Sequence, residues 1–350
     1  MDKERLNKSG RITESNSSST QILLLIIIFT VLGNTLVLVA TWREKRLHQP
    51  NKYFVACLAV ADLLVGILLA PTKLYKDYQS YEWLPSIHFC RFMAWIDTVA
   101  LAASIYTLTF ISIDRYVKIS KPLQYKSRMT TSTSVKIIFS VWLISFGLGT
   151  CILRRSNGIL GRSNGILGTG DSSCNKENKN FYIFLAIIAF FLPIVVMMVM
   201  YVLIYIVTHK RQKMLRNGQL GQMLNDQNQR ATFLQDLKVI RLFLLVIGVF
   251  IFCWLPYFVY LFYIFDHPNF FDPDIYSALN ISHWSWVLIS TAVASVLPLF
   301  NSLCNPIIYA CLHDQTYKKA FNDLFKRILC RARREPPNLN EIEFRSQIRT

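Results

Sequence analysis

Long blocks of apolar residues, separated by short polar segments, dominate the chain. A run of about 18 or more apolar residues is long enough to cross a bilayer as a helix. The runs are too long, and alternate too little, for the strands of a membrane barrel. The pattern therefore predicts an all-α membrane protein, a single bundle of seven transmembrane helices at residues 21–42, 54–75, 91–117, 135–153, 181–207, 238–265 and 285–311.

The segments outside the bundle have different compositions. Residues 1–20 are polar and predict an extracellular tail that precedes the seven-helix bundle at 21–311. Residues 312–334 place apolar side chains at helical spacing among Lys and Arg, which predicts a short amphipathic helix on the membrane surface. Cys330 near its end is a candidate lipidation site. Residues 335–350 predict a disordered cytoplasmic tail.

Charge predicts the orientation of the bundle in the plasma membrane. The net charge is +17, and Lys and Arg gather in the loops at 43–52, 118–136 and 210–241. Because basic loops stay in the cytoplasm, we expect an extracellular N-terminus and a cytoplasmic C-terminus. Asn7 and Asn16 lie in glycosylation sequons, which fits this orientation. The basic residues are spread over short loops, so they indicate contact with anionic membrane lipid and not with nucleic acid.

The third predicted helix carries a charged residue near each end. Asp97 and Arg115 are separated by five helical turns, roughly 27 Å, so they share one helix face. Charged side chains are costly in hydrocarbon and usually have a function there. The third helix therefore predicts a ligand site at one membrane surface and an effector site at the other.

Together, the polar and proline positions of the helices resemble those of the rhodopsin-like (class A) G-protein-coupled receptors. Pro71, Pro193 and Pro256 also predict bends in their helices. The resemblance covers nearly the whole chain and includes the triplet Asp114-Arg115-Tyr116. One landmark falls in each helix, namely Asn34, Asp62, Arg115, Trp142, Pro193, Pro256 and Pro306.

The resemblance implies roles for residues at the inner end. Asp114 and Asp236 would hold Arg115, and the Asp at 236, where relatives more often have Glu, implies a weaker lock. Leu123 would pack on the G protein, although the residue alone fits a membrane anchor equally well. The remaining implied sets are the tyrosines that rearrange (Tyr201 and Tyr309), the packing switch (Ile105, Pro193 and Phe250), the sodium site (Asp62, Ser104, Asn301, Ser302 and Asn305) and the disulfide (Cys90 and Cys174).

Asp97 indicates the class of ligand. It lies seven residues after Cys90, where aminergic receptors carry the carboxylate that pairs with an ammonium group. The predicted pocket has no Ser or Thr on the fifth helix, which disfavours a catecholamine and favours a less polar amine, as in the histamine, muscarinic or trace-amine branches. The full set of predicted pocket residues is Asp97, Thr98, Leu101, Leu185, Ala189, Trp254, Tyr257, Phe258 and Ser295.

These features predict a receptor for a cationic amine that activates a heterotrimeric G protein, with arrestin and a receptor kinase as further partners. The alternative is a class A receptor for a peptide or lipid, in which Asp97 pairs internally, for example with Lys73. A transporter is disfavoured because the sequence shows no repeats of spans. We expect no enzyme activity and no cofactor other than a sodium ion.

Overall fold

The computed structural model describes residues 2–43, 50–79, 87–156, 179–216, 227–266, 293–294 and 296–308, together with residues 322 and 326. Almost all of this part of the chain is helical. Its elements are α1 (Asp2–Arg43), α2 (Pro50–Leu64), the π-helical turn η2 (Val65–Leu69), α3 (Ala70–Gln79), α4 (Ile87–Ser120), α5 (Pro122–Arg128), α6 (Thr131–Ser156), α7 (Lys179–Ala186), the π-helical turn η3 (Ile187–Phe191), α8 (Leu192–Arg216) and α9 (Gln227–Asp266).

The helices have the lengths and the side-chain distribution of a membrane bundle. Within the described part of the chain, six helices are long and apolar enough to cross a membrane, and Val296–Ile308 forms a shorter apolar helix in the seventh predicted segment. Large apolar side chains such as Phe139 and Phe252 are exposed, whereas polar ones such as Asn34 are buried. This distribution suits a lipid bilayer, which solvates apolar side chains, whereas polar groups must find their hydrogen-bond partners inside the bundle. The predicted fold class is confirmed.

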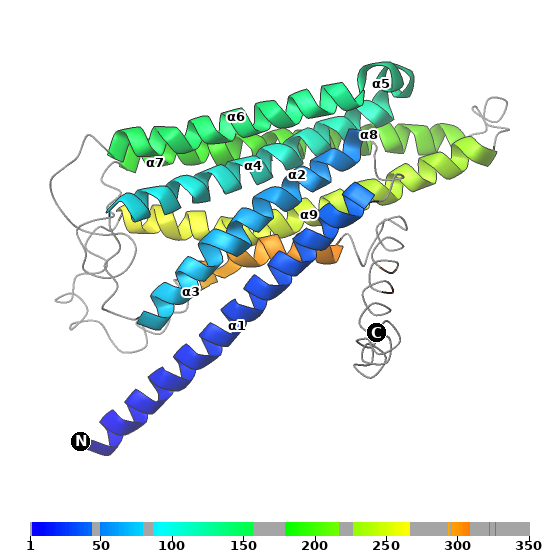
Figure 1. The fold of residues 1–350 in the computed structure, drawn as a ribbon. Coiled ribbons are helices and arrows are strands. Elements are labelled where there is room, and N and C mark those ends of the chain that lie inside the picture. Colours follow the sequence, from blue (N-terminus) through cyan, green and yellow to red (C-terminus); the bar gives the residue numbers. More distant parts are fainter. Residues whose placement is uncertain are drawn as a thin grey trace, which may run out of the picture.

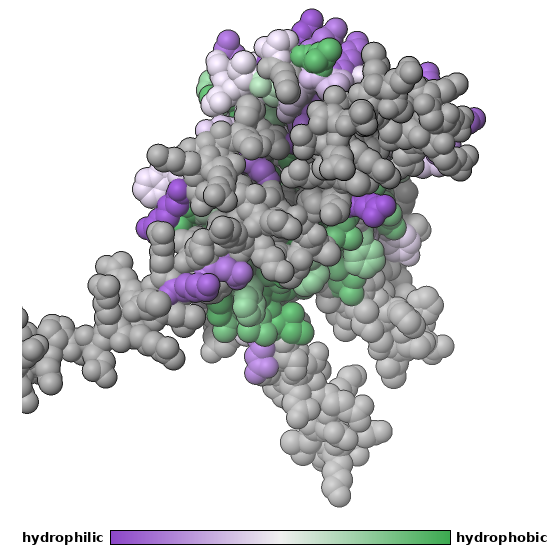
Figure 2. All heavy atoms as spheres, turned by 90° about the vertical axis from the view of Figure 1, so that its right-hand side faces the viewer, coloured by the Kyte–Doolittle hydropathy of each residue, from purple (hydrophilic) through white to green (hydrophobic). Residues whose placement is uncertain are grey.

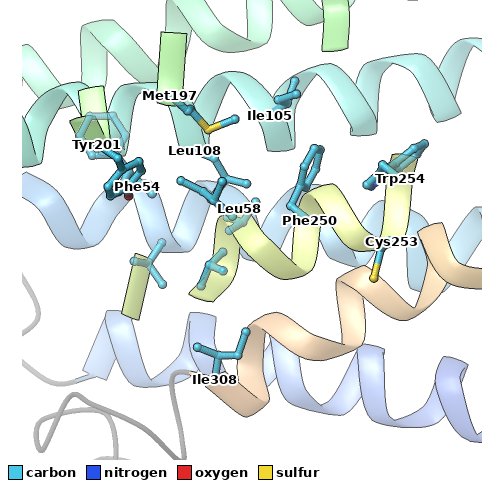
Figure 3. Close-up of a cluster of buried hydrophobic side chains, with 14 of the residues drawn as sticks. Phe54, Leu58, Ile105, Leu108, Met197, Tyr201, Phe250, Cys253, Trp254 and Ile308 are labelled. Carbon is cyan, nitrogen blue, oxygen red and sulfur yellow. The ribbon is translucent and has the colours of Figure 1, made fainter. Parts of the chain in front are cut away.

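Helix α4 occupies the centre of the bundle. It packs against α2, α6, α8 and α9, while α1 runs along α2 and α3 (Figure 1). We call the end at which α5 lies the inner end, and the opposite end the outer end. Between α4 and its neighbours lies the main apolar core, whose most deeply buried large side chains include Phe54, Leu58, Ile105, Leu108, Met197 and Phe250 (Figure 3).

Two glycines allow close contacts between helices. A Cβ atom at Gly149 of α6 would lie 2.8 Å from Val99 and 2.9 Å from Trp95, both on α4. A Cβ atom at Gly33 of α1 would lie 2.9 Å from Pro306. These distances are shorter than van der Waals contact, so α6 and the helix of residues 296–308 approach their neighbours through the missing side chains.

Both π-helical turns lie just before a proline. Pro71 and Pro193 have no backbone N–H, and their rings clash with the carbonyl four residues earlier. Each helix widens there, so that the N–H of Ala70 bonds the Val65 carbonyl and the N–H of Leu192 bonds the Ile187 carbonyl. At both prolines the predicted disturbance of the helix takes the form of a π-helical turn.

Several helix ends differ from the predicted ones. Residues 122–128, expected as a basic loop, form helix α5, with Pro122 at its first turn, where a missing N–H costs no hydrogen bond. Helices α1 and α9 begin well before the apolar runs at 21 and 238, since apolar length marks membrane thickness and not the end of helical hydrogen bonding. Of the predicted surface helix at 312–334, the structure describes Asn322 and Lys326, both helical and exposed.

Candidate functional site

The outer half of α4 presents Asp97 and Leu101 on one face, because the two residues are one helical turn apart. Asp97 is partly buried. Leu101 packs against the main core, which contains Trp254 and Phe258 of α9. The neighbouring hydroxyl of Thr98, also predicted to line the pocket, donates to the carbonyl of Ala94 in its own helix at 2.9 Å. The face of α4 that carries Asp97 therefore borders the core to which the aromatic residues of α9 belong.

Aromatic side chains of η3 and α9 form a cluster within the main core. Phe190 stacks on Phe258 with ring centroids 4.1 Å apart, and Trp254 contacts Tyr257 edge-on at 5.8 Å. Phe190 was missed by the sequence analysis, because it sits in a run that is apolar on every side and periodicity cannot assign its face. Offset and edge-on aromatic pairs add stability beyond their buried area and keep the rings in fixed positions.

The fifth transmembrane segment, α7–η3–α8, contributes only apolar side chains at the predicted contact positions. Leu185 and Ala189 are buried. The π-helical turn η3 is tied to α4 by the hydroxyl of Tyr106, which donates to the carbonyl of Ile188 at 3.2 Å. This bond fixes the segment beside α4, and the sequence analysis did not identify Tyr106.

A buried polar cluster lies around Asp62 of α2. The side-chain amide of Asn305 donates to Oδ2 of Asp62 at 2.8 Å, while Oδ1 has no hydrogen-bond partner among the described residues. Ser302 approaches the same carboxylate. Ser104 and Asn301, also predicted for this cluster, are buried as well. A buried carboxylate oxygen with a serine hydroxyl near the same carboxylate is chemically suited to a hard monovalent cation, which prefers oxygen ligands.

The predicted packing switch lies in the main core below the aromatic cluster. Ile105 of α4 and Phe250 of α9 belong to the same buried cluster, and Figure 3 shows their side chains between these two helices. Toward the outer end, the ring of Phe250 packs against that of Trp254, with ring centroids 6.1 Å apart. Pro193 is buried directly after η3. A chain of packed side chains thus connects the aromatic cluster with the middle of the bundle.

The inner end of α4 carries a buried ion pair. Nη2 of Arg115 lies 2.9 Å from Oδ2 of Asp114, and both side chains are almost fully buried. The hydroxyl of Tyr125, on α5, donates to Oδ1 of the same carboxylate at 2.8 Å. No sequence pattern predicted the role of Tyr125, since a tyrosine in a basic loop has no periodic neighbours. Leu123 of the same short helix is 87% exposed.

Two tyrosines predicted to act with this ion pair are described. Tyr201 of α8 is buried and lies within electrostatic range of Arg115. Tyr116 is partly buried and packs against the core. Asp236 lies in α9, but its side chain is outside the described part of the structure. Its expected contact with Arg115 stays a prediction.

The remaining predicted site residues also lie outside the described side chains. Residues 174, 295, 309 and 330 are not described, and Cys90 and the two sequon asparagines are described only as parts of helices α4 and α1. The disulfide, the glycosylation sites, the lipidation site and the pocket role of Ser295 therefore stay predictions.

Comparisons with known proteins agree with this geometry. The family model described as 7 transmembrane receptor (rhodopsin family) matches residues 33–309. The Alpha-1A adrenergic receptor of Mus musculus is 29% identical over 339 residues, which cover 89% of this chain and 68% of that protein. The D(2) dopamine receptor A of Xenopus laevis is 33% identical over 225 residues, which cover 63% of this chain and 48% of that protein.

Proposed function

Because the chain belongs to the rhodopsin family of seven-transmembrane receptors, we propose that it binds a small cationic amine at its outer end and activates a heterotrimeric G protein at its inner end. The observation that carries this proposal is the position of Asp97. Its carboxylate shares a face of α4 with Leu101, which packs against the core that contains Trp254. A partly buried carboxylate suits the ion pair with an ammonium group, and the aromatic residues of the adjoining core could add cation–π contact.

The side chains of the fifth transmembrane segment indicate which chemical groups the rest of the ligand carries. Leu185, Ala186 and Ala189 are buried and offer no side-chain hydrogen bond, and the hydroxyl of Tyr106 is already used by a backbone carbonyl. A ring hydroxyl directed at these three side chains would lose its water without gaining a partner. Relatives named as adrenergic and dopamine receptors support the amine class, while the apolar side chains favour an arylalkylamine without ring hydroxyls.

The signal passes between the two ends of α4 as a shift between helix arrangements. An amine that binds one arrangement better increases its population and is not itself changed. Phe250 and Ile105 pack between the aromatic cluster and the inner ion pair, so a change in the outer contacts can alter the packing on which Arg115 depends. The inner end, which carries α5, then lies on the cytoplasmic side of the plasma membrane. Arrestin and a receptor kinase would also bind there, and anionic lipid would surround the basic loops.

A sodium ion is the one inorganic ligand that belongs to this proposal. Asp62, Ser104, Asn301, Ser302 and Asn305 would hold it, and the open Oδ1 of Asp62 supports the assignment. When bound, the ion would neutralise a carboxylate that is otherwise buried at membrane depth. The hydrogen bond from Asn305 would hold the carboxylate of Asp62 in position for the ion, because it joins α2 to the helix of residues 296–308.

An amine series tests the ligand class. Cells that express the receptor are given phenethylamine, tyramine and dopamine, which differ in ring hydroxyls, and both cAMP and calcium are recorded. Burying an unpaired hydroxyl costs about 1–3 kcal/mol, so we expect phenethylamine to be at least as potent as tyramine and about 5- to 150-fold more potent than dopamine. A dopamine potency tenfold above that of phenethylamine would contradict the hydroxyl-free ligand.

The substitution Asp97→Ala tests the amine anchor itself. Removing one partner of a desolvated charge pair costs about 2–5 kcal/mol, so amine potency should fall roughly 30-fold or more at equal surface expression. Asp97→Glu, which keeps the charge, should retain part of it. If the Asp97→Ala receptor keeps full amine potency, the amine proposal fails. A class A receptor for a peptide or lipid, with Asp97 paired to Lys73, then becomes the better assignment.

A further inference from the structure

The π-helical turn η3 leaves one backbone carbonyl without its usual donor. In a regular α-helix, the carbonyl of Ile188 would accept the N–H of Leu192, four residues further on. That N–H bonds the carbonyl of Ile187 instead. The residue five positions on, Pro193, has no N–H to offer. The carbonyl of Ile188 therefore depends on a donor from outside its own helix.

Tyr106 of α4 supplies this donor. Its hydroxyl lies 3.2 Å from the carbonyl oxygen of Ile188, and both residues are partly buried. Hydrophilic side chains gather around α5 at the inner end (Figure 2), but Lys210, where the fifth segment reaches that end, is about six helical turns from Ile188. The neighbouring Ile187 is 49% exposed on the outside of the bundle. Because this position faces lipid, water does not replace Tyr106, and an unpaired carbonyl in hydrocarbon is costly.

The hydroxyl of Tyr106 favours one of two registers of the fifth segment. Pro193 leaves one carbonyl without a helical donor in either register. In the π-helical register that carbonyl belongs to Ile188, whereas in a regular α-helix it would belong to Ala189, four residues before the proline. Tyr106 bonds the first of these two carbonyls. Its hydrogen bond therefore stabilises the π-helical register.

The register decides which side of α7 faces the interior. A π-helical turn adds one residue, and one residue is about 100° of an α-helix, so α7 is rotated by that angle relative to α8. The buried side chains of Pro193, Met197 and Tyr201 mark the inward face of α8. In a regular α-helix, Leu185 would lie about 120° from the middle of that face, and with the extra residue it lies within about 20°. Leu185 is buried, as the π-helical register requires.

We propose that Tyr106 is a positioning residue for the amine site, because its hydrogen bond to Ile188 holds the register in which Leu185 lines that site. This inference rests on the proposed function and deepens it. In the π-helical register, the ring of an amine meets the large side chain of Leu185, one helical turn from Ala189. In the other register Leu185 turns toward lipid, and the smaller Ala186 takes its place.

A double-mutant cycle on phenethylamine affinity, measured on the full-length receptor in nanodiscs, tests the coupling between Tyr106 and Leu185. We expect Leu185→Ala to lower the affinity about tenfold in the otherwise unaltered receptor, because apolar contact with the ring is lost. In the Tyr106→Phe background the same change should cost less than about twofold, because Leu185 no longer faces the site. Tyr205→Phe is the matched control, since it removes a hydroxyl from a tyrosine that is 67% exposed and should leave the Leu185→Ala effect intact. An effect of equal size in both backgrounds would overturn the inference, because a merely stabilising role of Tyr106 predicts that result.

Cysteine reactivity measures the register without a ligand. Phe184→Cys and Leu185→Cys receptors are treated with an N-alkylmaleimide dissolved in the bilayer, and the reaction of the receptor's own cysteines is subtracted. Phe184 is 58% exposed, so its replacement should react in every background. We expect Leu185→Cys to react at least about tenfold more slowly in the unaltered receptor, because buried thiols are inert, and at nearly the rate of Phe184→Cys when Tyr106→Phe is added.

A second variant reaches the same register by another route. Pro193→Ala gives the carbonyl of Ala189 an N–H and so favours the regular α-helix. It should therefore raise the reactivity of Leu185→Cys as Tyr106→Phe does, and it replaces that variant if the latter does not fold. Slow reaction of Leu185→Cys in these backgrounds would overturn the inference. An unaltered receptor that binds no phenethylamine would overturn the proposed function, and the cysteine rates, which need no amine, separate that failure from a failure of the register.

Discussion

Tyr125 connects two features of the inner end that the sequence treats separately. Its hydroxyl donates to Oδ1 of Asp114, whose other oxygen pairs with Arg115, and Leu123 projects from the same short helix. We therefore expect a partner that contacts Leu123 to shift Tyr125 and, through its hydrogen bond, the ion pair of Asp114 and Arg115.

Tyr125→Phe removes this hydroxyl and keeps the ring. A hydrogen bond to a charged group contributes about 1.5–3 kcal/mol, so the arrangement in which Asp114 is held should lose population and ligand-independent nucleotide exchange should rise several-fold. Tyr205→Phe is the control, because it removes the same group from a tyrosine of α8 that is 67% exposed. An equal basal rate in both variants would show that the bond does not restrain Arg115.

At the scale of whole elements, the contact between α4 and α6 depends on the missing side chain of Gly149. A Cβ atom there would lie 2.9 Å from Trp95, which is itself stacked against Phe146 at 5.6 Å. Gly149→Ala should destabilise the receptor by about 1–3 kcal/mol, because the stacked ring has little room to move. Gly147 has nothing within 4 Å of the same atom, so Gly147→Ala should be neutral or slightly stabilising. Thermal unfolding of the two purified variants measures the difference, and equal melting temperatures would contradict it.

The elements also show what hydrophobic pattern can and cannot predict. Apolar runs predicted the helices because each must present apolar groups to lipid along its whole length. They did not predict α5, where Pro122 suggested a loop but occupies the first helical turn. They also could not assign faces within the uniformly apolar fifth segment, so Phe190 was missed while Trp254, beside a proline, was found. Polar contacts such as that of Tyr106 depend on a backbone carbonyl freed by a π-helical turn, which composition does not encode.

At the scale of the molecule, the polar cluster around Asp62 joins α1, α2 and the helix of residues 296–308. Asn305 bridges to Asp62 from the seventh segment, and Asn34 of α1 donates to the carbonyl of Ser302 at 3.1 Å. Of these four residues, all except Asn34 lie in α2 or in the helix of residues 296–308, and all four are at least nine-tenths buried. A cation added at the open carboxylate oxygen would stabilise the one arrangement in which all these groups converge.

Sodium should therefore stabilise the ligand-free receptor and weaken amine binding. Ligand-free protein is unfolded thermally in sodium chloride and in N-methylglucamine chloride of equal ionic strength, and phenethylamine affinity is measured in both. At ten times the dissociation constant, sodium would add about 1.4 kcal/mol of stability. If phenethylamine favours the other helix arrangement, linkage requires that sodium lower the affinity for the amine by the same factor by which the amine lowers the affinity for sodium.

Asp62→Asn, nearly identical in shape, should abolish both effects, because it removes the charge that binds the ion. A sodium response that survives in Asp62→Asn, or an equal response to both salts, would place the ion elsewhere or remove it from the mechanism.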